Sequence, residues 1–287
     1  DGVDISFSVE DGKVTVRAGR SRFTLSTLPA AEFPTVEAGD GEIDLDLAQP
    51  LVRQMIDRTG FAMAQQDVRY YLNGMYLEIK EGRLRFVATD GHRLALCTAP
   101  GQVAADDKSV IVPRKGVLEL SRLLDGDGSV TLSVGSNHIR AATHQFTFTS
   151  KLVDGKFPEY ERVLPRSPDK SVSGDRSELR QAFTRTAILS NEKYRGVRLS
   201  LTPGSLEITA NNPEQEQAEE SVPVEYAGEA LEVGFNVSYL LDVMGVLTGS
   251  TVRMSLSDSA SSALIEEGEA GGDADAEALY VVMPMRL

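Results

Sequence analysis

The sequence predicts an α+β protein built from tandem copies of one module. Five residues of a predicted strand pair recur at a constant offset of 122 positions: Gly74, Leu77, Gly82, Leu84 and Ala88 reappear as Gly196, Leu199, Gly204, Leu206 and Ala210. Upstream, residues 53–59 match residues 180–186 at an offset of 127. Helical and strand periodicities follow in the same order in both copies. Five matches in register indicate a duplicated module.

A partial copy is expected at the N-terminus. Ser26, Leu28, Phe33 and Pro34 match Ser150, Leu152, Phe157 and Pro158 at an offset of 124. We therefore expect residues 1–42 to be the C-terminal remnant of a first module, residues 43–168 a second module and residues 169–287 a third. The second boundary falls in the polar stretch 165–173. The opening on Asp1, without an initiator Met, also predicts an N-terminally shortened chain.

The elements of each module are expected in a fixed order. The chain opens with alternating apolar residues, typical of a strand, at Val3, Ile5, Phe7 and Val9. Helical spacing of apolar residues then predicts a first helix at residues 48–64 and again at residues 177–189. Strands follow, at residues 75–79 and 84–87 in the second module. A second helix is expected at residues 115–124 and 237–247.

The module ends are also marked in the sequence. Gly126, Gly128 and Gly249 are expected to stop the second helices. Further strands close each module, which ends at Pro34, Pro158 or Pro284. Residues 266–277 are acidic and Gly-rich, and they predict a hairpin loop that makes no contacts.

Composition bounds the class of protein. The 287 residues exceed one comfortable hydrophobic core, and 41% hydrophobic with 25% charged residues is ordinary globular usage. No stretch approaches the roughly 20 apolar residues that cross a bilayer, and no basic-then-apolar leader precedes Asp1. The single cysteine, Cys97, excludes an internal disulfide framework and a Cys-rich zinc site. A cytoplasmic protein without a metal or cofactor is expected.

The charge distribution predicts one basic surface. A net charge of −14 argues against nucleic-acid binding over the whole exterior. The predicted helices are nevertheless basic, with Arg53, Arg58, Arg114, Lys115, Arg122, Arg176, Arg180 and Arg185. Arg53 and Arg58 recur in phase as Arg180 and Arg185, which favours a shared basic face. The alternative is a set of ordinary solvated helix faces with local ion pairs.

Opposite ends of the chain carry opposite charges. Arg17, Arg20 and Arg22 lie in the remnant, and Glu214, Glu216, Glu219 and Glu220 lie in the last module. In a modular chain such patches permit head-to-tail association, which closes into a ring when the rotation allows it. The alternative is two unrelated surface runs.

One copy of the repeated strand pair is followed by a polar segment that the other copy lacks. Residues 88–95, Ala-Thr-Asp-Gly-His-Arg-Leu-Ala, have no counterpart of their Asp-Gly-His-Arg segment in the other copy, which indicates a site. Asp90 and His92 could form an acid/base pair. However, the three histidines show no zinc-protease spacing, and no nucleophile motif is present. Asp90-Gly91 is more simply a turn, and catalysis is not expected.

The chain resembles the bacterial sliding clamp family, the beta subunits of DNA polymerase III. The segments that carry the resemblance are residues 17–23 (RAGRSRF), 66–74 (QDVRYYLNG), 88–95 (ATDGHRLA), 191–196 (NEKYRG), 210–216 (ANNPEQE), 234–239 (GFNVSY) and 280–287 (YVVMPMRL). The resemblance covers almost the whole chain. It implies three similar modules per subunit and two subunits closed head to tail around duplex DNA, with helices inside. It also implies a processivity factor of DNA polymerase without catalysis of its own.

The resemblance also assigns residues. It implies a groove between the second and third modules for short linear peptides of the polymerase catalytic subunit, the clamp loader, other polymerases and repair proteins, formed by Leu72, Thr89, Gly91, His92, Arg93, Leu94, Pro158, Arg162, Val163, Tyr194, Asn236, Tyr239, Ser262, Val281, Val282, Met283, Pro284, Met285, Arg286 and Leu287. The expected DNA contacts are Gln65, Gln66, Arg69, Tyr70, Tyr71, Arg53, Arg58, Lys115, Arg122, Arg176 and Arg180. The expected dimer contacts are Arg17, Arg20, Arg22, Ile188, Leu189, Glu214, Glu216, Glu219 and Glu220.

Some of these assignments have alternatives. Tyr71, Val281 and Val282 could instead be ordinary core residues. A peptide-binding scaffold that does not encircle DNA remains the main functional alternative. The resemblance implies sequence-independent binding of duplex DNA, because Arg and Lys side chains meet phosphates rather than bases. It implies a bacterial cytoplasmic protein at the nucleoid, with no membrane association.

Overall fold

The computed structural model describes residues 2–33, 43–268 and 276–286. It divides into two compact units, residues 1–38 and residues 39–287. The smaller unit is an antiparallel sheet of β1 (Ile5–Glu10), β2 (Lys13–Ala18) and β3 (Ser21–Ser26), in that order. A 3-10 turn, Ala30–Glu32, follows. The strand expected at the start is confirmed, but Phe7 and Val9 are 69% and 68% exposed. Within the described residues, this apolar surface has no cover.

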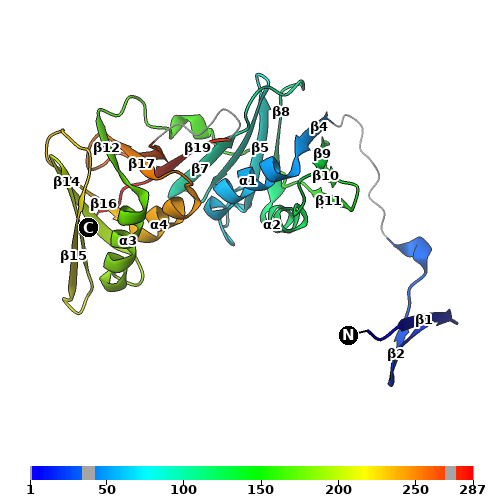
Figure 1. Ribbon diagram of the computed structural model, residues 1–287. Coiled ribbons are helices and arrows are strands. Elements are labelled where there is room, and N and C mark those ends of the chain that lie inside the picture. The colour runs from blue at the N-terminus through cyan, green and yellow to red at the C-terminus, as the bar shows by residue number, and fades with distance from the viewer. Residues whose placement is uncertain (1, 34–42, 269–275, 287) are drawn as a thin grey trace. The chain divides into compact units, whose positions relative to one another are not determined.

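Three antiparallel sheets form the larger unit (Figure 1). Their orders are β11-β10-β9-β4, β12-β17-β18-β19-β7-β6-β5-β8 and β15-β14-β13-β16. The strands are β4 (Ile43–Ala48), β5 (Gly74–Lys80), β6 (Arg83–Thr89), β7 (Arg93–Thr98), β8 (Lys108–Pro113), β9 (Ser129–Val134), β10 (His138–Ala142), β11 (Thr147–Lys151), β12 (Lys170–Asp175), β13 (Gly196–Thr202), β14 (Ser205–Asn211), β15 (Gln217–Pro223), β16 (Leu231–Asn236), β17 (Thr251–Leu256), β18 (Ala263–Glu267) and β19 (Glu277–Val282).

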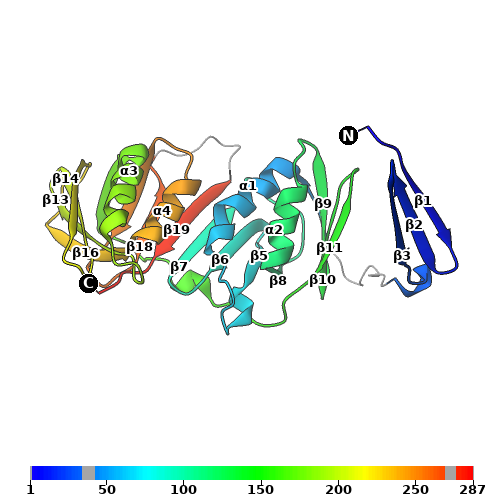
Figure 2. The same ribbon diagram turned by 90° about the horizontal axis from the view of Figure 1, so that it is seen from below.

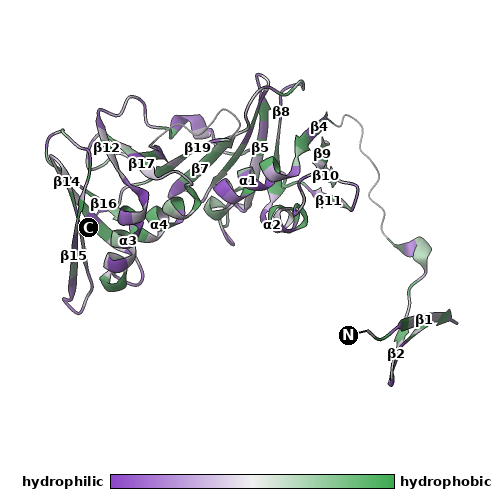
Figure 3. Ribbon diagram, in the orientation of Figure 1, coloured by the Kyte–Doolittle hydropathy of each residue, from purple (hydrophilic) through white to green (hydrophobic). Residues whose placement is uncertain are grey.

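Four α-helices in the described part of this unit lie on one face of the eight-stranded sheet. They are α1 (Gln49–Thr59), α2 (Arg114–Leu123), α3 (Arg176–Thr186) and α4 (Val237–Val246). Helix α1 contacts β6 and β7, α2 contacts β5 and β8, α3 contacts β12, and α4 contacts β19. Figures 1 and 2 show the helices in a row on the same side. In Figure 3, α1 and α3 carry both hydrophilic and hydrophobic colour, as expected for helices that bury one face.

The repeat predicted from the sequence is confirmed. Strands β5 and β6 recur as β13 and β14 at the offset of 122, and α1 recurs as α3 at the offset of 127. Both helices end earlier than expected, at Thr59 and Thr186, and continue as 3-10 turns, Gly60–Ala62 and Ala187–Leu189. The Thr59 hydroxyl donates to the Met55 carbonyl at 2.7 Å, and that of Thr186 donates to the Ala182 carbonyl at 2.9 Å. Such back-bonding perturbs a helix, and here it coincides with the change of pitch.

The second and third modules share one sheet, because β7 pairs with β19. This antiparallel joint has six residue pairs, from Arg93 with Val282 to Thr98 with Glu277. Alternation along the joint divides the apolar residues between two clusters. Ala95, Cys97, Tyr280 and Val282 belong to the core on the helix side. Leu94, Leu96 and Val281 belong to a second cluster, here called the outer cluster, on the opposite face.

One expectation about the loops was wrong. Residues 266–277 do make contacts in their described part: the Glu267 carboxylate accepts from the Thr248 and Gly249 N–H groups at 2.8 Å, and the Ala276 carbonyl accepts from Arg58. The polar stretch 165–173, in which a module boundary is expected, contains the start of β12 at Lys170. It looks polar because Val172 is its one buried side chain between Lys170 and Ser173. In the described residues, no helix has the length and apolar character needed to span a membrane.

Candidate peptide groove and DNA-facing surface

Residues 89–93 form a tight turn between β6 and β7. The Asp90 carboxylate accepts from the backbone N–H groups of His92 and Arg93, at 2.9 and 3.1 Å. The Thr89 hydroxyl donates to the Arg93 carbonyl at 2.6 Å and accepts from the Gly91 N–H at 3.1 Å. Gly91 has a φ of +90°, which side chains rarely tolerate. The segment that distinguishes this copy of the repeat therefore forms the turn, and its hydrogen bonds hold residues 89–93 together.

The C-terminal segment meets this turn. Beyond β19, the Met283 N–H donates to the His92 carbonyl at 2.9 Å, and the Met285 N–H donates to the Gly234 carbonyl at 2.9 Å. Met283 is 44% exposed, and Pro284 and Met285 are half-buried. The His92 ring lies 6.3 Å from the Tyr239 ring, with an interplanar angle of 21°. We call His92, Tyr239 and Met283 the lip.

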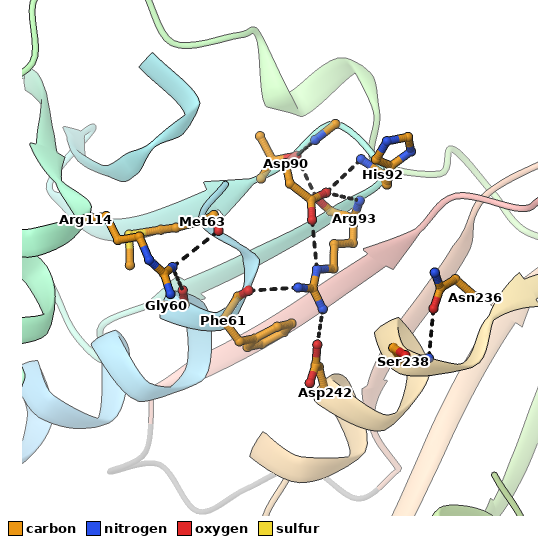
Figure 4. Close-up of polar contacts among 12 residues, drawn as sticks. Gly60, Phe61, Met63, Asp90, His92, Arg93, Arg114, Asn236, Ser238 and Asp242 are labelled. Carbon is orange, nitrogen blue, oxygen red and sulfur yellow. Dashed lines mark hydrogen bonds and ion pairs between the residues drawn. The ribbon is translucent and has the colours of Figure 1, made fainter. Parts of the chain in front are cut away.

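Arg93 points away from the outer cluster, toward the helices (Figure 4). Its guanidinium lies 4.5 Å from the Tyr239 ring centroid and 5.2 Å from that of Phe61. It forms ion pairs with Asp90 and Asp242 and donates to the Phe61 carbonyl at 3.0 Å. Its side chain is 12% exposed. Arg93 therefore links the second module to α4, and its assignment to the groove stays a prediction.

Several expected groove residues are buried in the outer cluster instead of lining an open surface. Leu72, Leu94 and Val281 are 1–3% exposed and pack with Phe157 and Tyr160. Val282 is fully buried on the helix side. The alternative of core residues thus holds for Val281 and Val282. Leu72, Leu94 and Val281 contribute the support beneath a groove rather than its surface.

A cavity of about 710 Å³ lies on the outer side, over β5 and β8. Pro158 and Arg162, expected in the groove, line it together with Tyr76 and Tyr160. Tyr76 stacks on Phe157 at 4.6 Å between ring centroids. The Tyr160 hydroxyl donates to the buried Glu78 carboxylate at 2.6 Å, and burial raises the pKa of Tyr160. His92 and Tyr239 are not part of this cavity, so the expected groove residues divide between two places.

The remaining expected groove residues lie at the surface or near it. Val163 and Tyr194 are 45% and 57% exposed, and the Lys193 ammonium lies over the Tyr194 ring. Asn236 caps α4 by accepting from the Ser238 N–H at 2.9 Å. Ser262 is half-buried and Arg286 is exposed. Leu287 lies outside the described residues.

The loop expected to meet DNA, residues 65–71, is largely exposed. Gln65, Gln66, Arg69 and Tyr70 are exposed, whereas Tyr71 is half-buried against the outer cluster. The Arg69 guanidinium donates to both oxygens of Asp67, at 3.0 and 2.8 Å. These bonds hold the pKa of Asp67 down at about 2. Arg69 therefore has a protein partner already.

The cations expected to face DNA lie on the helices, but not all are available. Arg53, Lys115, Arg122 and Arg180 are exposed, and Arg176 is half-buried. Arg58 is 6% exposed and donates to the Ala276 carbonyl and to the Thr248 hydroxyl. The expectation for Arg58 is therefore corrected, because its guanidinium is buried at the joint between the modules.

The residues expected at a dimer interface are at the surface. Arg17, Arg20 and Arg22 are exposed in the smaller unit. In the larger unit, Ile188 is 74% exposed and Leu189 is half-buried, while Glu214, Glu216 and Glu219 are exposed. Glu220 forms an ion pair with Arg185, and Glu216 accepts from the Asn212 amide.

The sequence analysis missed three residues of the site. Phe61 and Asp242 bind Arg93, and Asp67 binds Arg69. Asp67 stands two residues before Arg69, which is a spacing typical of an Asx turn and could have been noticed. Asp242 follows Tyr239 by three residues, so both share one face of α4. Nothing in the sequence links Phe61 to Arg93.

Two family models match the chain. The central domain of the DNA polymerase III beta subunit matches residues 46–159, and its C-terminal domain matches residues 161–286. The chain belongs to the beta sliding clamp family. The beta sliding clamp of Pseudomonas aeruginosa is 64% identical over 285 residues, which are 99% of this chain and 76% of that protein. The beta sliding clamp of Escherichia coli K12 is 54% identical over 288 residues, which are 100% of this chain and 77% of that protein.

Solved structures of clamps agree with this membership. A crystal structure of the Pseudomonas aeruginosa sliding clamp bound to griselimycin has a TM-score of 0.92 and 64% identity, and covers 99% of this chain and 76% of that one. The predicted α+β fold of sliding clamp modules is confirmed. The predicted class, a non-catalytic processivity subunit of DNA polymerase III, is confirmed as well. Asp90 and His92 accordingly form part of a turn, not an acid/base pair.

Proposed function

We propose that this clamp chain encircles duplex DNA with its helix face and holds partner peptides at the lip. The observation that carries the proposal is the arrangement of α1 to α4 on one side of the eight-stranded sheet, with the lip at the place where the turn 89–93 meets α4 and the C-terminal segment. A cytoplasmic location at the nucleoid belongs to this proposal.

The helix face suits sequence-independent DNA binding. Arg53, Lys115, Arg122 and Arg180 are exposed there. Arg53 pairs with Asp57 at 3.8 Å and Arg122 pairs with Glu119 at 2.9 Å, and all four side chains are at least 45% exposed. Such exposed pairs are weak, so phosphates can compete for the cations. Contacts of this kind depend on salt and carry no sequence information, which suits a ring that slides.

The lip suits a short apolar peptide from a polymerase, a clamp loader or a repair protein. Met283 and Met285 are flexible apolar side chains that adapt to different ligands. His92 and Tyr239 supply aromatic surface with polar atoms at their edges. Main-chain bonds from Met283 and Met285 fix the backbone of this segment, so binding a peptide does not have to order it.

The repeat supports head-to-tail assembly of two subunits. The strands of the modules correspond in order. Strand β15 follows β13 and β14 as β7 follows β5 and β6. Strand β3 is the last strand of the smaller unit, as β19 is the last strand of the third module. Within the chain, β7 pairs with β19. The corresponding edges, β15 and β3, are the outer strands of their sheets. They carry Glu219 and Glu220 on one and Arg22 on the other, so a second copy can make the same joint with opposite charges.

Retention on DNA of defined topology tests the proposal. The chain, loaded onto a nicked circular plasmid by a clamp loader, is expected to co-elute with it in gel filtration at moderate salt. Linearising the plasmid is expected to release the protein, because a ring leaves through a free end. Equal retention on both forms, or none on the circle, would favour the alternative of a scaffold that does not encircle DNA.

A further inference from the structure

Arg69 stands between the two candidate sites. Its guanidinium donates to Asp67 within the loop 65–71 and also to the Asp90 carbonyl of the turn 89–93, at 3.2 Å. The loop and the turn belong to different parts of the second module. Its side chain is 46% exposed, so an incoming phosphate can reach it. Arg69 is therefore placed to respond to DNA and to hold the turn.

Gly91 fits beneath Arg69. A Cβ atom built on Gly91 would lie 3.2 Å from both terminal nitrogens of the Arg69 guanidinium. This contact is tighter than ordinary van der Waals packing, so the glycine lets the guanidinium approach the turn. The close approach gives Gly91 a second role beside its positive φ.

Hydrogen bonds connect the turn to the lip. The Asp90 carboxylate binds the backbone of His92 and Arg93 and the Nε of Arg93. The His92 carbonyl accepts the Met283 N–H, and its ring lies beside Tyr239. One continuous set of contacts thus runs from Arg69 through Asp90 and His92 to Met283. Figure 4 shows the bonds of Asp90 to His92 and Arg93 within this set.

We propose that Arg69 is a positioning residue that couples the DNA-facing loop to the peptide lip. A DNA phosphate competes with the Asp90 carbonyl for the guanidinium, releases the turn, and so changes the affinity of the lip for a peptide. By reciprocity, a bound peptide changes the affinity of the loop for DNA by the same factor. The coupling rests on the proposed function, since it requires both sites.

The test measures peptide affinity with and without DNA. A fluorescent peptide rich in Gln, Leu and Phe is titrated with the full chain by anisotropy, alone and with a saturating primer-template hairpin. The wild-type dissociation constant is expected to shift by about fivefold or more when the hairpin is present. In Arg69→Ala this shift is expected to disappear. Arg83→Ala, which removes an exposed Arg of β6 outside the set, is expected to keep it.

Arg69→Lys separates coupling from simple DNA contact. Lysine keeps the charge that attracts phosphate, but it cannot span both Asp67 oxygens and the Asp90 carbonyl in the same geometry. We expect Arg69→Lys to bind the hairpin nearly as the wild type does and still to lose the shift. A shift retained in Arg69→Lys or in Arg69→Ala, or no shift in the wild type, overturns the coupling.

The peptide titration without DNA keeps failure of the coupling apart from failure of the proposed function. Wild-type binding that is lost in the Met283→Ala, Met285→Ala variant supports the lip as the peptide site. If the wild-type chain does not bind the peptide at all, the proposed groove fails and the coupling falls with it. Circular dichroism melting of each variant is expected to match the wild type, because Arg69 is at the surface.

Discussion

At the scale of single residues, the same residue type serves different purposes according to burial. Arg93, Arg58 and Arg69 were all assigned from the sequence to ligand contacts. Arg58 is buried and Arg93 is half-buried at the joint between the modules, where they bind protein groups. Arg69 is exposed but already paired with Asp67. Arg58 and Arg93 have partners in distant segments, Ala276 and Asp242, which could not be predicted from the sequence. Asp67 lies two residues before Arg69, so that pairing could have been predicted.

Cys97 illustrates how burial controls reactivity. It is fully buried in the helix-side core, and burial raises the pKa of its thiol from 9.0 to about 12, against the opposing effect of the nearby Arg58. The folded state therefore favours the neutral thiol. This contribution to stability is fully present below the unfolded pKa of about 8.5 and is lost as pH rises toward 12.

Alkylation provides the measurement. At pH 8 the native protein is expected to resist iodoacetamide, because the thiolate is both scarce and inaccessible. The same protein in denaturant is expected to react to completion, as mass spectrometry would detect. Free glutathione in the same tube is the reactivity control. Native labelling at the rate of glutathione would contradict the assigned environment of Cys97.

At the scale of elements, Arg93 links α4 to the second module. The guanidinium joins Asp90, Phe61, Tyr239 and Asp242. Of the two partners in the cross-module ion pair, Arg93 is 12% exposed and Asp242 is 46% exposed. Loss of the first therefore removes the partner of several groups, most of them half-buried, whereas loss of the second leaves a guanidinium with other partners.

Unfolding measurements are expected to reflect this asymmetry. Arg93→Ala should lower the free energy of unfolding by about 3 kcal/mol. Asp242→Ala should lower it by about 0.5 kcal/mol, because solvent screens the exposed carboxylate. Arg83→Ala is the matched control and should stay within about 0.5 kcal/mol of wild type. Equal losses for Arg93→Ala and Asp242→Ala, measured by urea denaturation, would contradict this asymmetry.

The elements themselves were largely predictable from local pattern. Period-two alternation and the fixed offset located β5, β6, β13 and β14. Helical spacing of apolar residues located the helices. The ends of α1 and α3 were missed because helical spacing continues into the 3-10 turns. The site was predictable only in part. Residues in one segment, such as His92 and Gly91, were found together, whereas contacts such as Asp242 with Arg93 depend on how α4 packs.

At the scale of the whole molecule, assembly is expected to depend on charge at two surfaces, one in each unit. The exposed Arg20 and Arg22 belong to the smaller unit, and the exposed Glu216 and Glu219 lie near or on β15. If these surfaces meet in a second copy, reversing one sign places like charges together, which costs binding energy.

Sedimentation velocity tests this expectation. Arg20→Glu with Arg22→Glu should shift the chain toward monomer by weakening association at least about tenfold, or about 1.4 kcal/mol. Adding Glu216→Lys and Glu219→Lys to the same chain should restore part of the association. High salt should reduce the difference between the variants. Unchanged association in the first variant would exclude these residues from the interface.

The joint between β7 and β19 also bears on how the lip can evolve. Its six residue pairs are held by main-chain hydrogen bonds, which do not depend on side-chain identity. The Met283 N–H donates to the His92 carbonyl, so the position of Met283 is held by its backbone rather than by its side chain. Mutations at Met283 can therefore retune what the lip recognises while the chain stays assembled. A ligand that bound only the Met283 side chain would therefore be sensitive to substitution of that residue, whereas one that also bound the backbone of the turn 89–93 would be less so.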